Sequence, residues 1–412
     1  MSPPPGDDGG SGDGSRPAVP SRVDRPALAR IVGDVHTFAR VAWGQEPLLR
    51  KAVDPTGFPD LLTHDSIDEL LGERGLRTPF LRVVKDGSTL ARADFTAPGG
   101  LGAGIADQVS DDKLTSLLAG GSTLVLQALH RVWPPIIAFC QQLAADLGHP
   151  VQANAYVTPP QNQGFDDHYD VHDVFVLQVA GSKKWSIHAP VHPAPLRDQP
   201  WTDRRDEVRR AAQEAPVIET VLEPGDVLYL PRGYLHAATA LGGVTVHLTL
   251  GVHSWTRHDV AEELVALALD RVADDEEARG SLPLGTELTA GELDSAPMVD
   301  KIQRALDDID VEDVAERLRA RRRRAQRAAP IGPLAQHALA MSLVEDTPLQ
   351  LRDHLDASLD TGRLTSRAGH VAVHDVPDDV LKRLLAGDVI PAGDLGLPTA
   401  RALIEAGVVV AG

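Results

Sequence analysis

Residues 223–236 read EPGDVLYLPRGYLH and contain the clearest turn and strand signals of the chain. Pro224-Gly225 predicts a tight turn, the apolar residues 227–230 predict a short strand, and Pro231-Arg232-Gly233 predicts a second turn. His236 follows the second turn almost at once. A short strand between two turns indicates a β-rich fold, with His236 as a potential ligand where the chain leaves the second turn.

The same pattern extends outward over residues 151–252, where short β-rich runs alternate with Pro and Gly. Strands are predicted at 153–157, 174–179, 184–187, 217–222, 226–230 and 244–250. No helical pattern of about ten residues separates most of these runs, which disfavours a doubly wound parallel sheet. The expected core is mainly β, as a sandwich or a small barrel.

Helical patterns flank this β-rich block on both sides. Residues 1–25 are rich in Pro, Gly and Ser, which predicts a disordered tail. The chain then divides into three expected units: a β-rich unit with N-terminal helices over 26–258, a helical segment over 259–332, and a final unit over 333–412. The final unit combines short helices with β-runs at 371–373 and 408–410, which suggests a winged-helix-like fold.

Composition and charge exclude several classes of protein. The chain has 412 residues and a net charge of −19, which disfavours general nucleic-acid binding. The single cysteine, Cys140, excludes a disulfide framework and a Cys-rich zinc site and fits a reducing, cytoplasmic location. Cys140 lies within the apolar stripe of a helix and is expected to be buried rather than nucleophilic. No apolar run reaches the roughly 18 residues of a membrane span, so no membrane contact is expected.

A metal site is predicted from His168-Tyr169-Asp170. On a strand, residues two apart share a face, so this imidazole and this carboxylate could bind one ion. His236 is the candidate third ligand. Two His and one carboxylate leave open positions on an Fe(II) ion, as in non-haem oxygenases, whereas a closed zinc site has no such room.

Other polar residues leave alternatives open. His172 shares the predicted face with His168 and Asp170, but three consecutive ligands on one strand would strain the geometry. His247 alternates with apolar residues along its strand, which fits a solvated face or a polar pocket wall equally well. The open positions of such an Fe(II) site could bind a 2-oxo acid such as 2-oxoglutarate, whose distal carboxylate would need a cation. Either Lys183 or Lys184 could supply it, and their positions alone do not distinguish them.

Together these motifs resemble the JmjC-type ribosomal oxygenases, which are cupin-fold Fe(II)/2-oxoglutarate protein hydroxylases. The resemblance rests on the runs at 154–160 (NAYVTPP), 163–165 (QGF), 168–170 (HYD), 173–178 (DVFVLQ), 181–185 (GSKKW) and 225–236. It implies a double-stranded β-helix (cupin/JmjC) barrel as the catalytic domain over 26–258. It also implies that the helical segment 259–332 forms a homodimer interface.

The resemblance also implies roles for individual residues. His168, Asp170 and His236 would bind Fe(II) and form the catalytic centre, with 2-oxoglutarate and O2 as co-substrates. The co-substrate pocket would contain Lys183, Asn154, Tyr156 and His247, with Lys183 rather than Lys184 binding the C5 carboxylate. One departure is Gly251, where some relatives carry Ser. Arginyl-hydroxylating bacterial relatives have Arg at the position of Lys183, so Lys resembles the histidyl branch.

The implied partner is a protein substrate, a basic ribosomal protein hydroxylated on a histidyl or arginyl side chain, which an acidic enzyme would attract. Two alternatives are a hydroxylase of a peptide natural product and a non-catalytic cupin-like binding module.

An arginine cluster near the end of the helical segment also allows several interpretations. They are a solvated helix end, a salt-bridged seam with acidic residues 307–316, and a contact with ribosomal RNA. The cluster consists of Arg317, Arg319, Arg321, Arg322, Arg323, Arg324 and Arg327.

Overall fold

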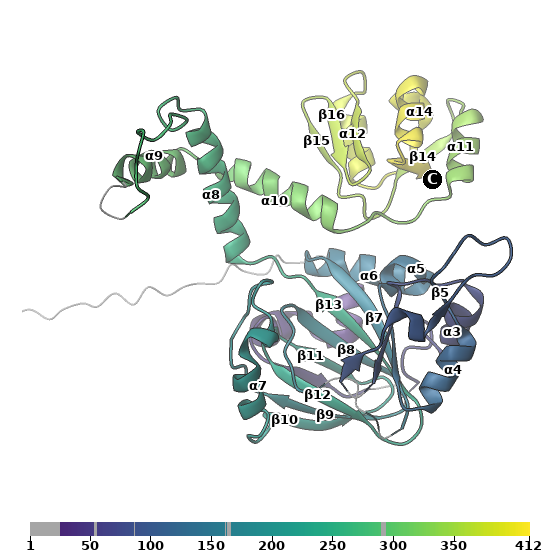
Figure 1. Ribbon diagram of the computed structural model, residues 1–412. Coiled ribbons are helices and arrows are strands. Elements are labelled where there is room, and N and C mark those ends of the chain that lie inside the picture. Colours follow the sequence, from purple (N-terminus) through teal and green to yellow (C-terminus); the bar gives the residue numbers. More distant parts are fainter. Residues whose placement is uncertain (1–24, 53–55, 86, 161, 163–165, 290–293) are drawn as a thin grey trace, which may run out of the picture.

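The computed structural model describes residues 25–52, 56–85, 87–160, 162, 166–289 and 294–412. The predicted disordered tail falls outside these residues except for its last position, and so does the motif at 163–165. Within the described part, two sheets form the core of the first half of the chain (Figure 1).

The larger sheet has eight strands in the order β1-β11-β8-β13-β7-β6-β2-β3. Its strands are β1 (Leu48–Arg50), β2 (Leu81–Lys85), β3 (Ser88–Thr89), β6 (Thr123–Leu126), β7 (Val151–Thr158), β8 (Asp173–Ala180), β11 (Val227–Leu230) and β13 (Thr245–Val252). The smaller sheet has the order β10-β9-β12, with β9 (Lys183–His188), β10 (Ile218–Leu222) and β12 (Leu235–Ala240). A two-stranded ribbon, β4 (Thr96–Ala97) and β5 (Gln108–Val109), lies apart.

Strand β8 is buried on both faces, which explains its nearly continuous apolar sequence. Val174 and Val176 pack with Trp185 of the smaller sheet, whereas Phe175 and Leu177 join the core beneath the helices. The two sheets therefore share an apolar interior. The predicted mainly β core is confirmed, but among the described residues the two sheets are hydrogen-bonded separately and form no closed barrel.

The predicted strands all occur, with small shifts at their ends. Strand β12, which carries His236, was not predicted. His168 was expected on a strand but instead forms an isolated antiparallel bridge with His236. The mixed polar sequence around both residues lacks the alternation that predicts a strand.

Helices cover the outer face of the larger sheet (Figure 1). Helix α6 (Pro134–Leu147) begins with two prolines and ends at Gly148, whose φ of 74° is the left-handed conformation that suits glycine. Cys140 is buried within it, and burial raises the pKa of its thiol to about 12, which fits the predicted inert role. The other helices of this half are α1 (Pro26–Val32), α2 (Val35–Thr37), α3 (His64–Asp68), α4 (Asp111–Ala119), α5 (Leu129–Val132) and α7 (Arg205–Ala211). The same half also contains two short π-helical segments, Phe38–Ala42 and Glu69–Glu73, and two 3-10 turns, Arg92–Asp94 and Trp201–Arg204.

Three helices then lead away from the sheets and back (Figure 1): α8 (Arg257–Ala273), α9 (Ala296–Asp307) and α10 (Val311–Ala325). Helix α8 begins with a capping box, in which Thr256 and Asp259 satisfy each other's backbone amides. These helices agree with the helical pattern predicted after the β-rich block. None of the helices in the described residues is long and apolar enough to cross a membrane.

The last part of the chain has an apolar core of its own, in which Leu349, Leu384 and Leu403 are fully buried. Its helices are α11 (Pro333–Met341), α12 (Asp378–Leu385), α13 (Ala392–Leu395) and α14 (Leu397–Glu405). Two three-stranded sheets accompany them, formed by β14 (Pro348–Leu351), β18 (Ile390–Pro391) and β19 (Val409–Ala411), and by β15 (Ser358–Asp360), β16 (Arg363–Ser366) and β17 (Gly369–Ala372). We call residues 333–412 the C-terminal unit, and its winged-helix-like character stays a prediction.

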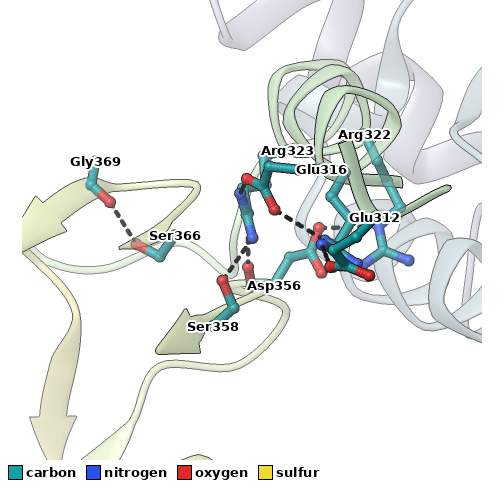
Figure 2. A network of polar contacts seen from close by, with 9 residues as sticks. Glu312, Glu316, Arg322, Arg323, Asp356, Ser358, Ser366 and Gly369 are labelled. Atoms are coloured by element: carbon teal, nitrogen blue, oxygen red, sulfur yellow. Dashed lines mark hydrogen bonds and ion pairs between the residues drawn. The ribbon is translucent and has the colours of Figure 1, made fainter. Parts of the chain in front are cut away.

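Polar contacts join α10 to the C-terminal unit (Figure 2). Arg322 pairs with Asp356, and Arg323 donates to Ser358 Oγ over 2.7 Å and to Glu316 Oε1 over 3.1 Å. Arg319 pairs with Glu312 and Glu316 on its own helix. Five of the seven arginines therefore belong to a seam of ion pairs and not to a solvated helix end. This seam differs from the predicted one, because only Arg319 and Arg323 pair with residues 307–316. Arg317 and Arg321 pair with carboxylates of α8, and Arg322 pairs with Asp356.

A glycine at the turn after β8 is required by the close approach of two strands. Gly181 has a φ of 63°, and a Cβ there would lie 2.7 Å from the backbone oxygen of Val244. We expect Gly181→Ala to lower the free energy of unfolding by about 1–3 kcal/mol, measured by urea denaturation. Gly72→Ala is the control, because nothing lies within 4 Å of its Cβ position. Equal stability of the two variants would contradict the argument.

Candidate metal centre

Three ligand atoms from two distant parts of the chain meet at one point. The metal-ligating atoms of His168, Asp170 and His236 all lie within 4.8 Å of one another. The two imidazole rings are 4.4 Å apart between centroids, and His236 Nε2 lies 3.7 Å from Asp170 Oδ2. The structure therefore brings the three predicted ligands together.

Backbone hydrogen bonds hold the two halves of this triad in register. His236 N–H donates to the carbonyl oxygen of His168 over 2.8 Å, and His168 N–H donates back over 3.3 Å. Gly233 N–H donates to the carbonyl oxygen of Asp170 over 3.1 Å. The turn at Pro231-Arg232-Gly233 thus fixes His236 opposite His168 and Asp170.

Both imidazoles are oriented by their second nitrogen. Nδ1 of His168 lies 2.7 Å from the carbonyl oxygen of Asp166, and Nδ1 of His236 lies 3.1 Å from that of Tyr234. A carbonyl oxygen only accepts, so each Nδ1 carries the proton and each Nε2 presents a lone pair. This is the arrangement by which proteins prepare His for a metal ion.

The charge states also suit a cation. Burial lowers the pKa of His236 to about 4, so its imidazole is neutral near pH 7. Burial alone would raise the pKa of Asp170, but the neighbouring imidazoles, His172 foremost, lower it overall. A neutral imidazole and a charged carboxylate are the forms that bind metals.

A cavity of about 360 Å³ opens onto the triad. Its walls come from both sheets and from the segments between them. The residues that line it are Arg82, Gly87, Tyr156, Asp166, His168, Asp170, Val174, Val176, Lys183, Trp185, Trp201, His236, Ala237, Ala238, His247 and Thr249.

Lys183 and Lys184 point in opposite directions at the start of β9. Lys184 pairs with Glu219 at the surface, over 2.7 Å. Lys183 is only 3% exposed and lines the cavity, where its Nζ donates to Thr158 Oγ1 over 3.2 Å. No carboxylate among the described residues pairs with Lys183, and burial lowers its pKa to about 7. Such a cation suits an anionic ligand in the cavity.

His247 lies in the pocket wall and not on a solvated strand face, because it is only 3% exposed. Its ring stacks on Tyr156 with centroids 4.8 Å apart, and Trp185 meets it edge-on at 5.5 Å. Nδ1 of His247 and Nε1 of Trp185 are buried without a hydrogen-bond partner among the described residues. Buried polar atoms of this kind are usually satisfied by a ligand or by water.

Two predicted residues lie outside the cavity lining. Asn154 accepts a hydrogen bond from Ala128 N–H over 3.0 Å and sits opposite Thr249 in the sheet, and its co-substrate role stays a prediction. His172 lies 3.4 Å from Gln152 Nε2 and does not belong to the triad. A Cβ on Gly251 would lie 3.0 Å from His172 Cε1, so glycine there leaves room for this ring.

Sequence reasoning missed Arg82 and Trp201, which also line the cavity. Arg82 lies on β2, far upstream of the β-rich block, within an alternating strand that gives no sign of a functional residue. Trp201 lies in a 3-10 turn between β9 and β10. Only the folded chain brings either residue to the triad.

Comparisons with known proteins agree with this site. Residues 132–260 match the JmjC domain family, and this range contains all three residues of the triad. This part of the chain is therefore similar to a JmjC domain. Ribosomal oxygenase 1 of Rattus norvegicus is 36% identical to this protein over 174 residues, which are 41% of this chain and 28% of the relative.

The predicted resemblance to ribosomal oxygenases is thereby confirmed. The human ribosomal oxygenase 1 is 30% identical over 256 residues, which cover 60% of this chain and 37% of that protein. The Aedes aegypti bifunctional lysine-specific demethylase and histidyl-hydroxylase NO66 is 30% identical over 222 residues, which cover 53% of this chain and 33% of the relative. The chain thus matches about a third of the length of these curated relatives.

The JmjC fold is also found in a solved structure that matches nearly the whole chain. The Escherichia coli ribosomal oxygenase YcfD aligns with a TM-score of 0.55 at 17% identity, over 92% of this chain and 98% of that one. A YcfD structure in complex with cobalt and 2-oxoglutarate aligns with a TM-score of 0.52 at 16% identity, over 90% and 96% of the two chains. At this identity the likeness concerns the fold, and it confirms the predicted cupin/JmjC architecture.

The buried charge of Lys183 has a consequence for stability. Its pKa of about 7 lies below the 10.5 of an exposed lysine, so between these values the unfolded chain binds a proton that the folded chain does not. Stability therefore rises with pH across this window, by up to about 5 kcal/mol. We expect Lys183→Met to flatten this rise in urea unfolding of the metal-free protein.

The matched control is Lys184→Met, which removes an exposed and paired lysine. It is expected to keep the pH dependence of the unmodified chain. An equal slope in all three proteins would show that burial does not lower the pKa of Lys183.

Proposed function

We propose that the protein is an Fe(II)- and 2-oxoglutarate-dependent oxygenase that hydroxylates a side chain of a protein substrate. The observation that carries this proposal is the convergence of His168, Asp170 and His236 beside a cavity that also holds Lys183. The similar ribosomal oxygenases and the YcfD complex with cobalt and 2-oxoglutarate support it.

The donor set fits Fe(II). Two imidazoles and one carboxylate are the ligands of the facial triad, which leaves positions for other molecules. Both His residues present Nε2 with the proton fixed on Nδ1, so no rearrangement of their protons is needed. When bound there, Fe(II) would supply the site at which a 2-oxo acid and O2 react.

The residues of the chain would bind and orient the co-substrate. Lys183 would bind the C5 carboxylate of 2-oxoglutarate. The carboxylate would neutralise the ammonium group, which is buried without an acidic partner among the described residues. Tyr156 would line the same pocket and His247 would donate or accept a hydrogen bond beside it. Val174, Val176 and Trp185 supply apolar walls that limit access of water.

We propose a basic ribosomal protein as the substrate, hydroxylated on a histidyl or arginyl side chain. The names of the relatives support this choice. The net charge of −19 would favour encounter with a cationic partner, and Asp166 in the cavity wall would attract a positive side chain. Lys183 in place of Arg favours the histidyl reaction by resemblance.

We also propose that two copies associate through the helices α8 and α9. Val265, Leu269 and Val299 on these helices are about half exposed, at 48%, 50% and 47%. Exposed apolar side chains on adjacent helices are typical of a subunit interface. The catalytic, helical and C-terminal units with the boundaries given above, and a cytoplasmic location, remain part of this proposal.

The alternatives are weaker. A non-catalytic binding module has no need of two imidazoles oriented for a metal, a buried lysine and unsatisfied polar atoms in one cavity. A hydroxylase of a peptide natural product would use the same groups, so only the substrate distinguishes it.

Removal of one triad ligand tests the chemistry. We expect Asp170→Ala to lower Co(II) affinity at least about tenfold and to abolish succinate release from 2-oxoglutarate with Fe(II) and ascorbate, while the unfolding midpoint is kept. Co(II) binding is measured by titration calorimetry. Asp198→Ala, an exposed aspartate elsewhere, is the control. Full activity of Asp170→Ala would refute the assigned triad.

The substrate is tested by intact-mass spectrometry of ribosomal proteins from cells with and without this enzyme. We expect one protein to gain the mass of one oxygen atom when the enzyme is present, because hydroxylation inserts a single oxygen. Cells that express Asp170→Ala serve as the control. An unchanged set of masses, together with turnover in vitro, would favour the natural-product alternative.

A further inference from the structure

A second cavity, of about 610 Å³, lies between the JmjC domain and the C-terminal unit and is separate from the metal centre. We call it the arginine cleft, because six of its lining residues are arginines and none is acidic. They are Arg131 on α5, Arg323 and Arg324 on α10, Arg327 in the following segment, and Arg352 and Arg367 in the C-terminal unit. In a chain with a net charge of −19, such a local excess of cations requires an explanation.

Two of these arginines are neutralised by acidic neighbours. Arg323 pairs with Glu316 over 3.1 Å on its own helix (Figure 2). Arg367 lies 3.9 Å from Asp356, a carboxylate that it shares with Arg322. These pairs belong to the seam that attaches α10 to the C-terminal unit, and they account for only part of the positive charge.

The other four arginines have no such partner. No ion pair within the described part of the chain involves Arg131, Arg324, Arg327 or Arg352. Arg352 donates to the carbonyl oxygens of Ala329 over 2.6 Å and Gly407 over 3.2 Å. These bonds satisfy two of its N–H donors, but a neutral carbonyl group does not compensate its positive charge. The cleft therefore holds about four uncompensated positive charges.

Three arginines of the cleft, Arg131, Arg352 and Arg367, are partly withdrawn from water, whereas Arg324 and Arg327 are exposed. Burial lowers the pKa of Arg131, and the charge of Arg327 lowers it further. Burial also lowers the pKa of Arg352 and of Arg367. Nε of Arg367 is buried without a hydrogen-bond acceptor among the described residues. Like charges held together in this way cost free energy, which a bound anion would recover.

We propose that the arginine cleft binds a compact ligand that carries several phosphate groups. A guanidinium group can donate two parallel hydrogen bonds to the oxygens of one phosphate group. The arginines of the cleft come from three parts of the chain and could surround such a ligand. His130 adds a neutral donor, because its Nδ1 accepts from Ala153 N–H over 3.0 Å and the ring proton therefore resides on Nε2.

The surroundings favour a compact ligand over a nucleic-acid strand. The acidic residues of the seam, Glu312, Glu316 and Asp356, lie close to the cleft (Figure 2). A strand of RNA would leave the cleft and cross a surface whose overall charge repels phosphates. A small polyphosphate would keep all its charges within the cleft.

Such a ligand would connect the two parts of the molecule. Gln326, in the wall of the cleft, donates to the carbonyl oxygen of Val151 over 3.3 Å, and His130 accepts from Ala153. Both backbone groups belong to β7, the strand that carries Tyr156 to the metal centre. Occupancy would therefore stabilise the C-terminal unit against the JmjC domain and raise the unfolding temperature.

Inorganic tripolyphosphate is the probe, titrated into the full-length, metal-free protein by calorimetry at low salt. We expect one saturable site and a higher unfolding temperature on binding. The double variant Arg131→Gln/Arg327→Gln is expected to lose at least about tenfold in affinity. Its own stability should be unchanged or raised, because two like charges are removed.

The control is Arg209→Gln/Arg210→Gln, which removes two arginines from α7 that do not line the cleft, and should bind as the unmodified protein does. Absence of saturable binding, or an equal loss in both double variants, would overturn the proposal. Binding of a single-stranded RNA through Arg131 and Arg327 without binding of tripolyphosphate would overturn it in favour of a nucleic-acid contact. None of these outcomes depends on oxygenase activity.

Discussion

A single pair of backbone hydrogen bonds, between His168 and His236, is the contact on which the candidate metal centre depends. It is the isolated bridge that joins the segment after β7 to the beginning of β12. The side chains of both residues leave the bridge toward Asp170, and their second nitrogens are held by carbonyl groups nearby. The geometry of the triad is therefore fixed by the backbone, before any ion contributes.

Much of the fold could be predicted because its strands and helices have strong local patterns. The apolar run of β8, the alternation in β13 and the Pro-Pro to Gly frame of α6 each identify one element. Strand β12 could not be predicted, since its sequence LHAATA alternates weakly and its pairing partner, β9, lies about fifty residues earlier. Pairing at that distance is set by the tertiary fold, which local patterns do not encode.

Some residues of the candidate site could be predicted from local sequence, and others could not. The triad and the inward direction of Lys183 agree with the expectation from motifs, because strand geometry and a recognisable combination of residues constrain them. Arg82 and Trp201 contribute through the approach of distant segments, and their own sequence context is ordinary. The arginine cluster was ambiguous for a related reason: the carboxylates that neutralise part of it include Asp356, in a different unit of the chain.

The incomplete closure between the two sheets has an evolutionary consequence. Each sheet keeps its own ladder of hydrogen bonds, and they share an apolar interior lined by residues such as Val176 and Trp185. The segment 166–172, which precedes β8 of the larger sheet, carries two of the three ligands but belongs to neither ladder. Insertions or substitutions around this segment can reshape the entrance without breaking a ladder. The entrance to the metal centre can therefore change while both sheets keep their hydrogen bonds.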